Sequence, residues 1–423
     1  MWRARSLCPI PLLFAFVSLK VILPPSPERK LIKDDYKNVS QLITSNGYPV
    51  EEYTVTTRDS YVIMIQRIPK GRTEPQGQRR KPVAFLMTGL LSSSADYVVN
   101  LPDQSLGFIL ADNGFDVWLG NVRGTTYSSH RRLKNWMKKY WDFSFDEMIN
   151  FDLPAQIDMI LEKTGSPSLL YVGWSQGSLI MFGLLASKPR YNEKVRLFNA
   201  IAPVAYLGHM TSEMKEMVPF ADFLDGLLQM TLNGAFLAKN GPVFQQIKKD
   251  ECGSTMQRPA CKAVFKLVNG GFPIEMNKTR FPVYLANNPA GSSVRNMYHF
   301  AQIIRDNRLQ MFDWGPLQNK KIYGQKRPPE YDLSRVTAPV ALYWSAGDVL
   351  ARPVDVKHLA KRLPNVVLSY KVPVRGFTHI DFVWSIYAKD HLYKEILRIM
   401  LKYSQEQQPP SLPGFDRNNT VRM

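Results

Sequence analysis

The stretch Ser168–Gly177, which reads SLLYVGWSQG, decides the fold of this chain. Its apolar run Ser168–Val172 is typical of a short buried strand, and Ser178–Ser187 is typical of a helix. A serine between two glycines at such a junction predicts a sharp, strained turn that lifts the serine oxygen above the sheet. Backbone N–H groups at the helix start can stabilise a negatively charged oxygen there. The alternative is an ordinary loop rich in small residues.

Bulk composition indicates a globular protein. The chain has 423 residues, of which 45% are hydrophobic and 21% are charged, and these values argue against global disorder. The length suffices for one large core plus an insertion. No internal repeat is present.

The N-terminus is typical of a secretory signal. Arg3 and Arg5 precede the apolar run Leu7–Leu19, which Lys20 ends. That run is too short to span a bilayer but suits a signal peptide, which we place at residues 1–23 without a defined cleavage point. The alternative is an uncleaved anchor. The expected location is the secretory pathway, with an extracellular or lysosomal destination.

Cysteine usage agrees with secretion. Cys8 lies in the signal, so Cys252 and Cys261 are a candidate disulfide that closes a short loop, with two free thiols as the alternative. Three sequons are candidate glycosylation sites in that compartment: Asn38, Asn277 and Asn418.

The charge is strongly basic, with a formal net value of +18. The basic residues are scattered and follow no nucleic-acid-binding motif, so no nucleic-acid partner is expected. Attraction to an anionic lipid or glycan surface is the favoured use of this charge. For any single basic pair, a solvated surface is the simpler explanation.

Strand and helix patterns alternate along most of the chain. This alternation predicts an α/β fold with a mainly parallel sheet. The expected elements are a hairpin at Tyr53–Ile68, strands at Lys81–Met87, Phe115–Leu119, Leu197–Val204, Val340–Tyr343 and Val366–Val372, and helices at Phe145–Glu162, Val354–Leu363 and Asp381–Tyr403.

The alternation breaks after Tyr206 and resumes near Val340. The intervening residues are rich in Met, Phe and Leu, which indicates a mostly helical cap or lid inserted over the sheet. The predicted division is a core of residues 35–205 and 336–403, a cap of 206–335, and a polar tail of 404–423.

A serine on such a turn needs a base to accept its proton and an acid to orient that base. In α/β-hydrolases the chain order is serine, acid, histidine. Of the six histidines, His379 lies in a loop directly after the last expected strand. His358 and His391 fall within helices, and His299 lies in the cap ahead of the candidate acids. His379 is therefore the expected base.

The acid has two candidates. Asp348 follows the strand Val340–Tyr343 through a turn, where a loop carboxylate at a strand end belongs. Its rival Asp355 has the position of a residue that interacts with a helix N-terminus. Asp381 is too close in sequence to His379 to reach the ring from the correct side. We favour Asp348.

An oxyanion hole requires two backbone donors. The N–H of Gln176, the residue after the serine, supplies one. The loop after the strand ending at Met87 supplies the other, and there Leu90 is the expected donor.

With these residues in place, the chain resembles the acid lipase family, which includes gastric and lysosomal lipases, from about Asn38 to Lys402. The segments that carry the resemblance are Gln41-Leu42-Ile43, Gly47-Tyr48-Pro49, Glu51-Glu52-Tyr53, Gly89-Leu90-Leu91, Asn121-Val122-Arg123-Gly124, Phe143-Ser144-Phe145-Asp146-Glu147-Met148, Asp152-Leu153-Pro154-Ala155, Ser175-Gln176-Gly177, Pro328-Pro329-Glu330-Tyr331-Asp332-Leu333 and His379-Ile380-Asp381-Phe382.

The resemblance implies an α/β-hydrolase core and roles for particular residues. By it, Ser175, Asp348 and His379 match the nucleophile, acid and base, and Leu90 and Gln176 match the oxyanion donors. The Cys252–Cys261 spacing resembles the family's cap disulfide.

Two positions depart from the family pattern. Trp174 and Thr88 stand where the family usually has histidine. Both changes are expected to alter the walls near the serine, and so to affect substrate preference.

The expected function is hydrolysis of lipid esters, such as triacylglycerol or cholesteryl ester, at a lipid–water interface and through an acyl-enzyme. Neither a metal nor an organic cofactor is expected. The alternatives are a catalytically silent lipid-binding protein, and an esterase or acyltransferase acting on a soluble ester. The sequence indicates neither the oligomeric state nor the pH optimum.

Overall fold

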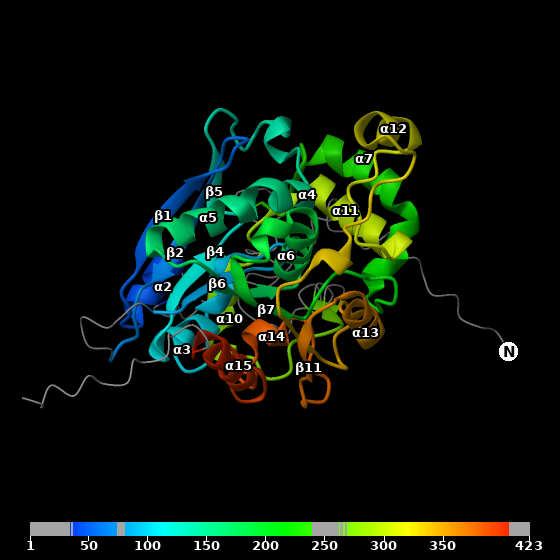
Figure 1. Cartoon of the computed structure of the whole chain (residues 1–423). Coiled ribbons are helices and arrows are strands. Elements are labelled where there is room, and N and C mark those ends of the chain that lie inside the picture. The colour runs from blue at the N-terminus through cyan, green and yellow to red at the C-terminus, as the bar shows by residue number, and fades with distance from the viewer. Residues whose placement is uncertain are drawn as a thin grey trace, which may run out of the picture.

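The computed structural model describes residue 34 and residues 37–73, 81–238, 262, 265, 266 and 269–405. Within these ranges, nine strands form one sheet in the order β1-β2-β4-β3-β6-β7-β10-β11, with β5 paired to β2 (Figure 1). The strands are β1 Glu51–Thr56, β2 Tyr61–Ile68, β3 Val83–Met87, β4 Asp116–Gly120, β5 Ser128–His130, β6 Leu169–Trp174, β7 Val195–Ile201, β10 Val340–Trp344 and β11 Val366–Lys371.

The sheet is antiparallel at one edge and parallel elsewhere. Strands β1 and β2 form an antiparallel hairpin, and β2 also pairs antiparallel with β4. From β4 through β3, β6, β7 and β10 to β11, every pairing is parallel. All residues of β3, β4 and β6 are buried, as expected for parallel strands covered on both faces. The hairpin prediction is confirmed, and so is the mainly parallel sheet.

Helices cover both faces of the sheet. In Figure 1, α5 and α6 lie above it, and α3, α14 and α15 lie below it. Eleven of the residues in α6, from Gln176 to Ala186, are buried, so this helix lies in the core of the protein. The helices outside the inserted segment are α2 Val39–Ser45, α3 Leu106–Asp112, α4 Phe145–Glu147, α5 Leu153–Thr164, α6 Gln176–Ser187, α13 Pro353–Arg362, α14 Asp381–Trp384 and α15 Lys394–Gln405.

The segment between β7 and β10 contributes α7, α11 and α12 at the upper right of Figure 1, whereas its helix α10 lies near the centre of the view. Helix α11 contains seven buried residues and packs against α7. The described elements of this segment are α7 Ala221–Thr231, β8 Ala235–Phe236, α10 Phe281–Asn287, β9 Ser292–Ser293, α11 Val294–Asp306 and α12 Pro316–Tyr323.

Two helix predictions need correction. The helix expected at Phe145–Glu162 contains a π-helical turn, Met148–Asp152, between α4 and α5, and it continues to Thr164. The helix expected at Asp381–Tyr403 is broken after Trp384, where α14 ends, and it resumes with a π-helical turn, Lys389–Tyr393, that leads into α15. Ser385 has an extended backbone at this break. Among the described helices, none has the length and apolar character needed to cross a bilayer.

Candidate active site

Ser175 lies on the predicted turn between β6 and α6. Its backbone has φ 53° and ψ −116°, a conformation that a residue with a Cβ rarely adopts. Holding such a residue costs on the order of 1–3 kcal/mol, so the surrounding structure must enforce it. The serine is 8% exposed.

The two flanking glycines are required by close backbone approach. A Cβ on Gly177 would lie 2.4 Å from the carbonyl oxygen of Met87, at the end of β3. A Cβ on Gly173 would lie 2.7 Å from the backbone of Gly177 itself. The strand, the turn and the first turn of α6 are therefore pressed together, and only glycine fits at either position.

His379 and Asp348 form a buried pair. The Nδ1 atom of His379 lies 2.8 Å from Oδ2 of Asp348. The other carboxylate oxygen, Oδ1, accepts hydrogen bonds from the backbone N–H groups of Leu350 (2.8 Å) and Ala351 (2.9 Å). The carboxylate is thus fixed on both sides. Because it contacts Nδ1 of the imidazole, Nε2 is left without a hydrogen-bond partner among the described residues.

The hydrogen bonds among the described residues include none between Ser175 and His379. Serine–histidine contacts in hydrolases commonly tighten only in the substrate complex. A tryptophan joins the two loops instead. Nε1 of Trp174, next to the serine, donates to the backbone oxygen of His379 at 3.2 Å, and the two rings lie 5.6 Å apart.

The loop that carries His379 is held by its neighbours on either side. The carboxylate of Asp381 accepts the backbone N–H of Thr378 at 2.6 Å, and Oδ1 of Asn269 accepts the N–H of Ile380 at 2.9 Å. Burial raises the pKa of Asp381 to about 6. Sequence reasoning considered Asp381 only as an acid and missed both anchors. The short spacing between Asp381 and His379 could have indicated that Asp381 holds the loop of His379.

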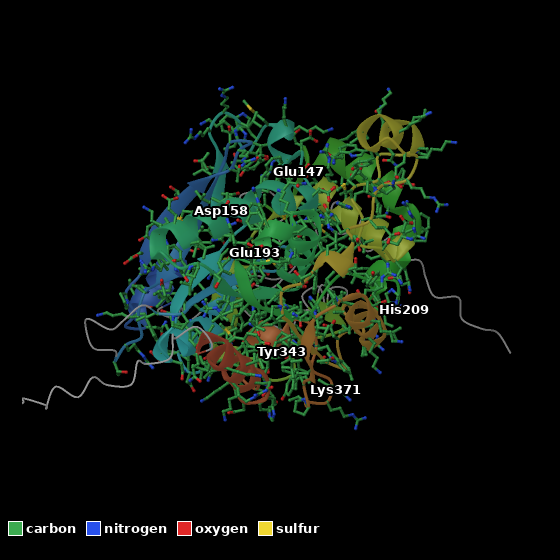
Figure 2. The ribbon with its side chains drawn as sticks, in the orientation of Figure 1. Glu147, Asp158, Glu193, His209, Tyr343 and Lys371 are labelled. Carbon is green, nitrogen blue, oxygen red and sulfur yellow. The ribbon has the colours of Figure 1, made fainter. Side chains whose placement is uncertain are left out.

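Asp355, the alternative candidate for the acid, contacts a different histidine. Asp355 is buried, and its carboxylate accepts the backbone N–H of His209 at 3.1 Å and lies 2.7 Å from its Nδ1. His209 is labelled in Figure 2, at the side of the molecule near α13. Asp355 therefore orients a different histidine from the predicted base.

The cap histidine is likewise separate from the pair. His299 is fully buried, stacks on Phe145 with ring centroids 3.7 Å apart, and bonds the carbonyl of Gln310 at 3.0 Å. Desolvation lowers the pKa of its ring to about 3.

The two residues that depart from the family pattern, Trp174 and Thr88, are buried. Trp174 is 5% exposed and Thr88 is fully buried. Thr88 Oγ1 donates to the buried carboxylate of Asp96 at 3.3 Å. Each of the two side chains tethers a loop that borders the serine.

The predicted oxyanion loop lies against the serine turn. A Cβ on Gly89 would lie 3.3 Å from Cβ of Ser175, and Leu90 follows it directly. Gln176 is the first residue of α6, so its N–H has no acceptor within its own helix. Its side-chain oxygen accepts a 2.7 Å hydrogen bond from Asn296 of α11. This link between the inserted segment and the serine turn was not foreseen.

The predicted glycosylation sites, cysteine pair, signal and tail do not contribute to the described active site. Asn38 is exposed and caps α2, and Oδ1 of Asn277 accepts the backbone N–H of Thr279 at 3.2 Å. The predicted signal, Cys252, Cys261, Asn418 and the polar tail from residue 406 lie outside the described residues. In the described part of the chain, no group of three or more His, Cys, Asp or Glu side chains could hold a metal ion.

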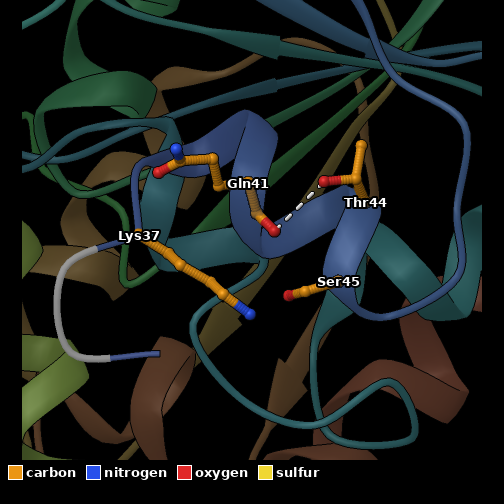
Figure 3. A pocket seen from close by; sticks show the side chains of 4 residues that line it. All are labelled: Lys37, Gln41, Thr44 and Ser45. Atoms are coloured by element: carbon orange, nitrogen blue, oxygen red, sulfur yellow. Dashed lines mark hydrogen bonds between the residues drawn. The ribbon is translucent and has the colours of Figure 1, made fainter. Parts of the chain in front are cut away.

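A surface hollow beside α2 contains none of the predicted site residues. Figure 3 shows its lining, and in it Thr44 Oγ1 donates to the carbonyl oxygen of Gln41 at 3.3 Å. The lining residues are Lys37, Gln41, Thr44 and Ser45. The hollow is therefore a feature of α2 and the residues just before it.

A mainly parallel sheet, with a strained serine turn and an Asp–His pair on loops that follow its strands, defines an α/β-hydrolase. Family models agree: residues 39–101 match a partial α/β-hydrolase lipase region, and residues 89–385 match the α/β-hydrolase fold. The chain is 39% identical to gastric triacylglycerol lipase of Mus musculus, covering 89% of this chain and 93% of the relative.

Two further relatives are also lipases. Lipase member K of Homo sapiens is 38% identical, covering 87% of this chain and 92% of the relative. Lipase lipl-1 of Caenorhabditis elegans is 40% identical, covering 85% and 90%. The chain belongs to the acid lipase family of α/β-hydrolases, and it is a carboxylic ester hydrolase.

A solved structure extends the likeness at the level of the fold. The crystal structure of lip1 from Acinetobacter baumannii AYE superposes with a TM-score of 0.51 at 13% identity, covering 87% of this chain and 96% of that chain.

Proposed function

We propose that the protein is a lipase that hydrolyses triacylglycerols, cholesteryl esters or both, with Ser175 as nucleophile, His379 as base and Asp348 as the acid that orients it. The contact that carries the assignment is the 2.8 Å distance between Nδ1 of His379 and the buried carboxylate of Asp348. It leaves Nε2 of the ring to accept a proton from the serine.

The reaction has two halves. Ser175 Oγ attacks the ester carbonyl carbon while His379 takes its proton, and the N–H groups of Leu90 and Gln176 stabilise the tetrahedral oxyanion. The carbon–oxygen bond to the alcohol then breaks, and the alcohol leaves with the proton from His379. Water then attacks the acyl carbon while His379 takes its proton, and the bond to Ser175 Oγ breaks. The serine oxygen recovers the proton from His379 and the fatty acid leaves.

The substrate class is supported by the named relatives, among which gastric triacylglycerol lipases recur. Residues 206–335 act as a cap over the sheet, and α11 connects it to the serine turn through Asn296 and Gln176. Within this cap, Cys252 and Cys261 form a disulfide. The enzyme travels the secretory pathway to an extracellular or lysosomal destination, and Asn38, Asn277 and Asn418 are its candidate glycosylation sites.

Activity measurements on the full chain and on Ser175→Ala test this function. We expect the wild type to release fatty acid from emulsified triacylglycerol or cholesteryl ester faster than from short soluble esters, and Ser175→Ala to release none. Undiminished activity of Ser175→Ala would exclude this nucleophile. Activity confined to soluble esters would contradict the lipid substrate. Fatty acid bound by an inactive wild type would favour a carrier.

A further inference from the structure

An exposed segment with both apolar and basic side chains runs from Trp314 through α12 to Arg327, and we call it the α12 surface. Its apolar members are exposed to an unusual degree: Leu317 is 83% exposed, Ile322 is 54% exposed and Trp314 is 38% exposed. A leucine that leaves most of its side chain in water contributes little to the fold. The α12 helix lies at the upper right edge of the molecule in Figure 1.

All charged side chains of the α12 surface are positive. Four exposed basic residues lie between Trp314 and Arg327, and this stretch contains no acidic residue. The basic residues are Lys320, Lys321, Lys326 and Arg327. Among the described residues, none of the four forms an ion pair. The surface therefore presents uncompensated positive charge beside apolar side chains.

The inner side of the helix is held firmly. Asn319 is 1% exposed, and its side chain accepts the N–H of Trp314 at 3.0 Å and donates to Asp313 at 2.7 Å and to the carbonyl of Lys326 at 3.0 Å. Tyr323 donates to the carbonyl of Phe312 at 2.9 Å. The segment thus has a fixed orientation, which turns Leu317 and Ile322 outward.

We propose that the α12 surface binds an anionic lipid membrane, with Leu317 and Ile322 inserted at the headgroup boundary and the basic side chains on the lipid phosphates and carboxylates. Apolar side chains flanked by lysine are the pattern of helices that lie in a membrane interface. An acidic glycan would satisfy the charges but would leave the exposed leucine and isoleucine in water. The surface is separate from the Ser175 site, so it adds a membrane-binding role to the proposed hydrolysis.

Vesicle binding of the full chain tests the proposal. The vesicles consist of ether-linked phosphatidylcholine, with or without ether-linked phosphatidylserine, because an ester hydrolase cannot cleave ether lipids. We expect binding only where phosphatidylserine is present. Salt should weaken it, because the screening length falls from about 10 Å at 0.1 M to about 3 Å at 1 M.

One double variant and one single variant, each with a matched control, locate the contact. Each lysine removed should weaken binding roughly fivefold, so Lys320→Gln/Lys321→Gln should lose about 25-fold. The control Lys357→Gln/Lys361→Gln removes the same charge from exposed positions on α13 and should bind nearly as the wild type does. Leu317→Glu should weaken binding roughly tenfold, and Val354→Glu, at a 54% exposed position on α13, should not.

Hydrolysis of a short soluble ester is measured on each variant and should equal that of the wild type. This readout separates failure of the membrane contact from failure of the active site. Equal losses in the α12 and α13 variants would overturn the proposal, since net charge alone would then explain binding. Equal binding to both vesicle types would also overturn it, as would retention on heparin without binding to vesicles.

Discussion

The indole nitrogen of Trp174 donates a hydrogen bond to the main-chain oxygen of His379 across 3.2 Å. The residue beside the predicted nucleophile thereby fixes the loop that carries the predicted base. Asp381 and Asn269 hold the backbone on either side of His379. The position of the imidazole is therefore set by residues from three separate segments of the chain.

Removing this hydrogen bond should slow catalysis more than it weakens the fold. Trp174→Phe keeps an aromatic ring but loses the donor, and a net hydrogen bond is worth about 1 kcal/mol. We expect kcat on a soluble ester to fall roughly fivefold while KM stays unchanged. Trp174→His retains a ring nitrogen that can donate, and should recover part of the loss.

The matched control is Trp141→Phe. Trp141 is also 5% exposed, and its Nε1 also donates to a backbone oxygen, that of Asn135. This variant should lose stability without a change in the kcat of the folded enzyme. Equal effects of both substitutions on kcat would show that Trp174 acts only through general packing.

The two carboxylates that sequence reasoning weighed against each other can be separated by paired variants. Asp348→Asn should lower kcat by roughly 10³- to 10⁴-fold, because the asparagine no longer holds His379 in the tautomer that accepts the serine proton. Asp355→Asn should leave kcat within about twofold, since Asp355 bonds His209 instead. The reverse ranking would reassign the acid.

Much of this arrangement could be predicted from local sequence. The serine turn is a local feature, because Gly173, Ser175 and Gly177 encode a sharp bend next to a recognisable strand. The choice of Asp348 over Asp355 followed from its place after a strand. Both inferences depend on residues close together in the chain, where periodicity and turn chemistry are informative.

The partners that hold the loops could not be predicted in the same way. Asn269 and Asn296 lie far along the chain from the residues they bond, and asparagine is common in loops, so nothing in the sequence singles them out. The contacts of Trp174 could not be predicted from the sequence for a similar reason. Its burial depends on how Gly89 and the His379 loop close around it.

Two glycines offer a test of the close packing at the serine turn. Gly177→Ala should destabilise the protein by about 1–3 kcal/mol and remove activity, because its Cβ would lie 2.4 Å from the carbonyl oxygen of Met87. Gly226→Ala in α7 should stabilise it by about 0.5–1 kcal/mol, since a Cβ there meets no atom within 4 Å. Chemical denaturation measures both. A Gly177→Ala variant as stable as the wild type, or more stable, would contradict the packing described for Gly177.

Because of the buried carboxyl group of Asp146, we expect the folded protein to be more stable in acid than at neutral pH. Asp146 lies in α4 and accepts the backbone N–H of Phe312 at 2.8 Å and the hydroxyl of Tyr331 at 2.7 Å. Burial, and then the neighbouring carboxylate of Glu147, raise its pKa from 3.8 to about 7. Between those values the folded protein keeps a proton that the unfolded chain has lost, so the free energy of unfolding falls as pH rises.

Asp146→Asn should remove that dependence. In denaturant titrations at a series of pH values, the wild type should lose on the order of a few kcal/mol of stability between about pH 4 and 7 through this group, and the variant should not. Parallel curves for the two proteins would mean that Asp146 does not carry the effect.

Covalent trapping of the nucleophile is the most direct test of the proposed chemistry. An alkyl phosphonate ester that mimics the tetrahedral intermediate is incubated with the full chain, and the labelled peptide is identified by mass spectrometry. We predict one adduct, on Ser175, formed in step with the loss of lipase activity and absent from Ser175→Ala. An adduct on another residue that accompanies full inactivation would contradict the proposed active site.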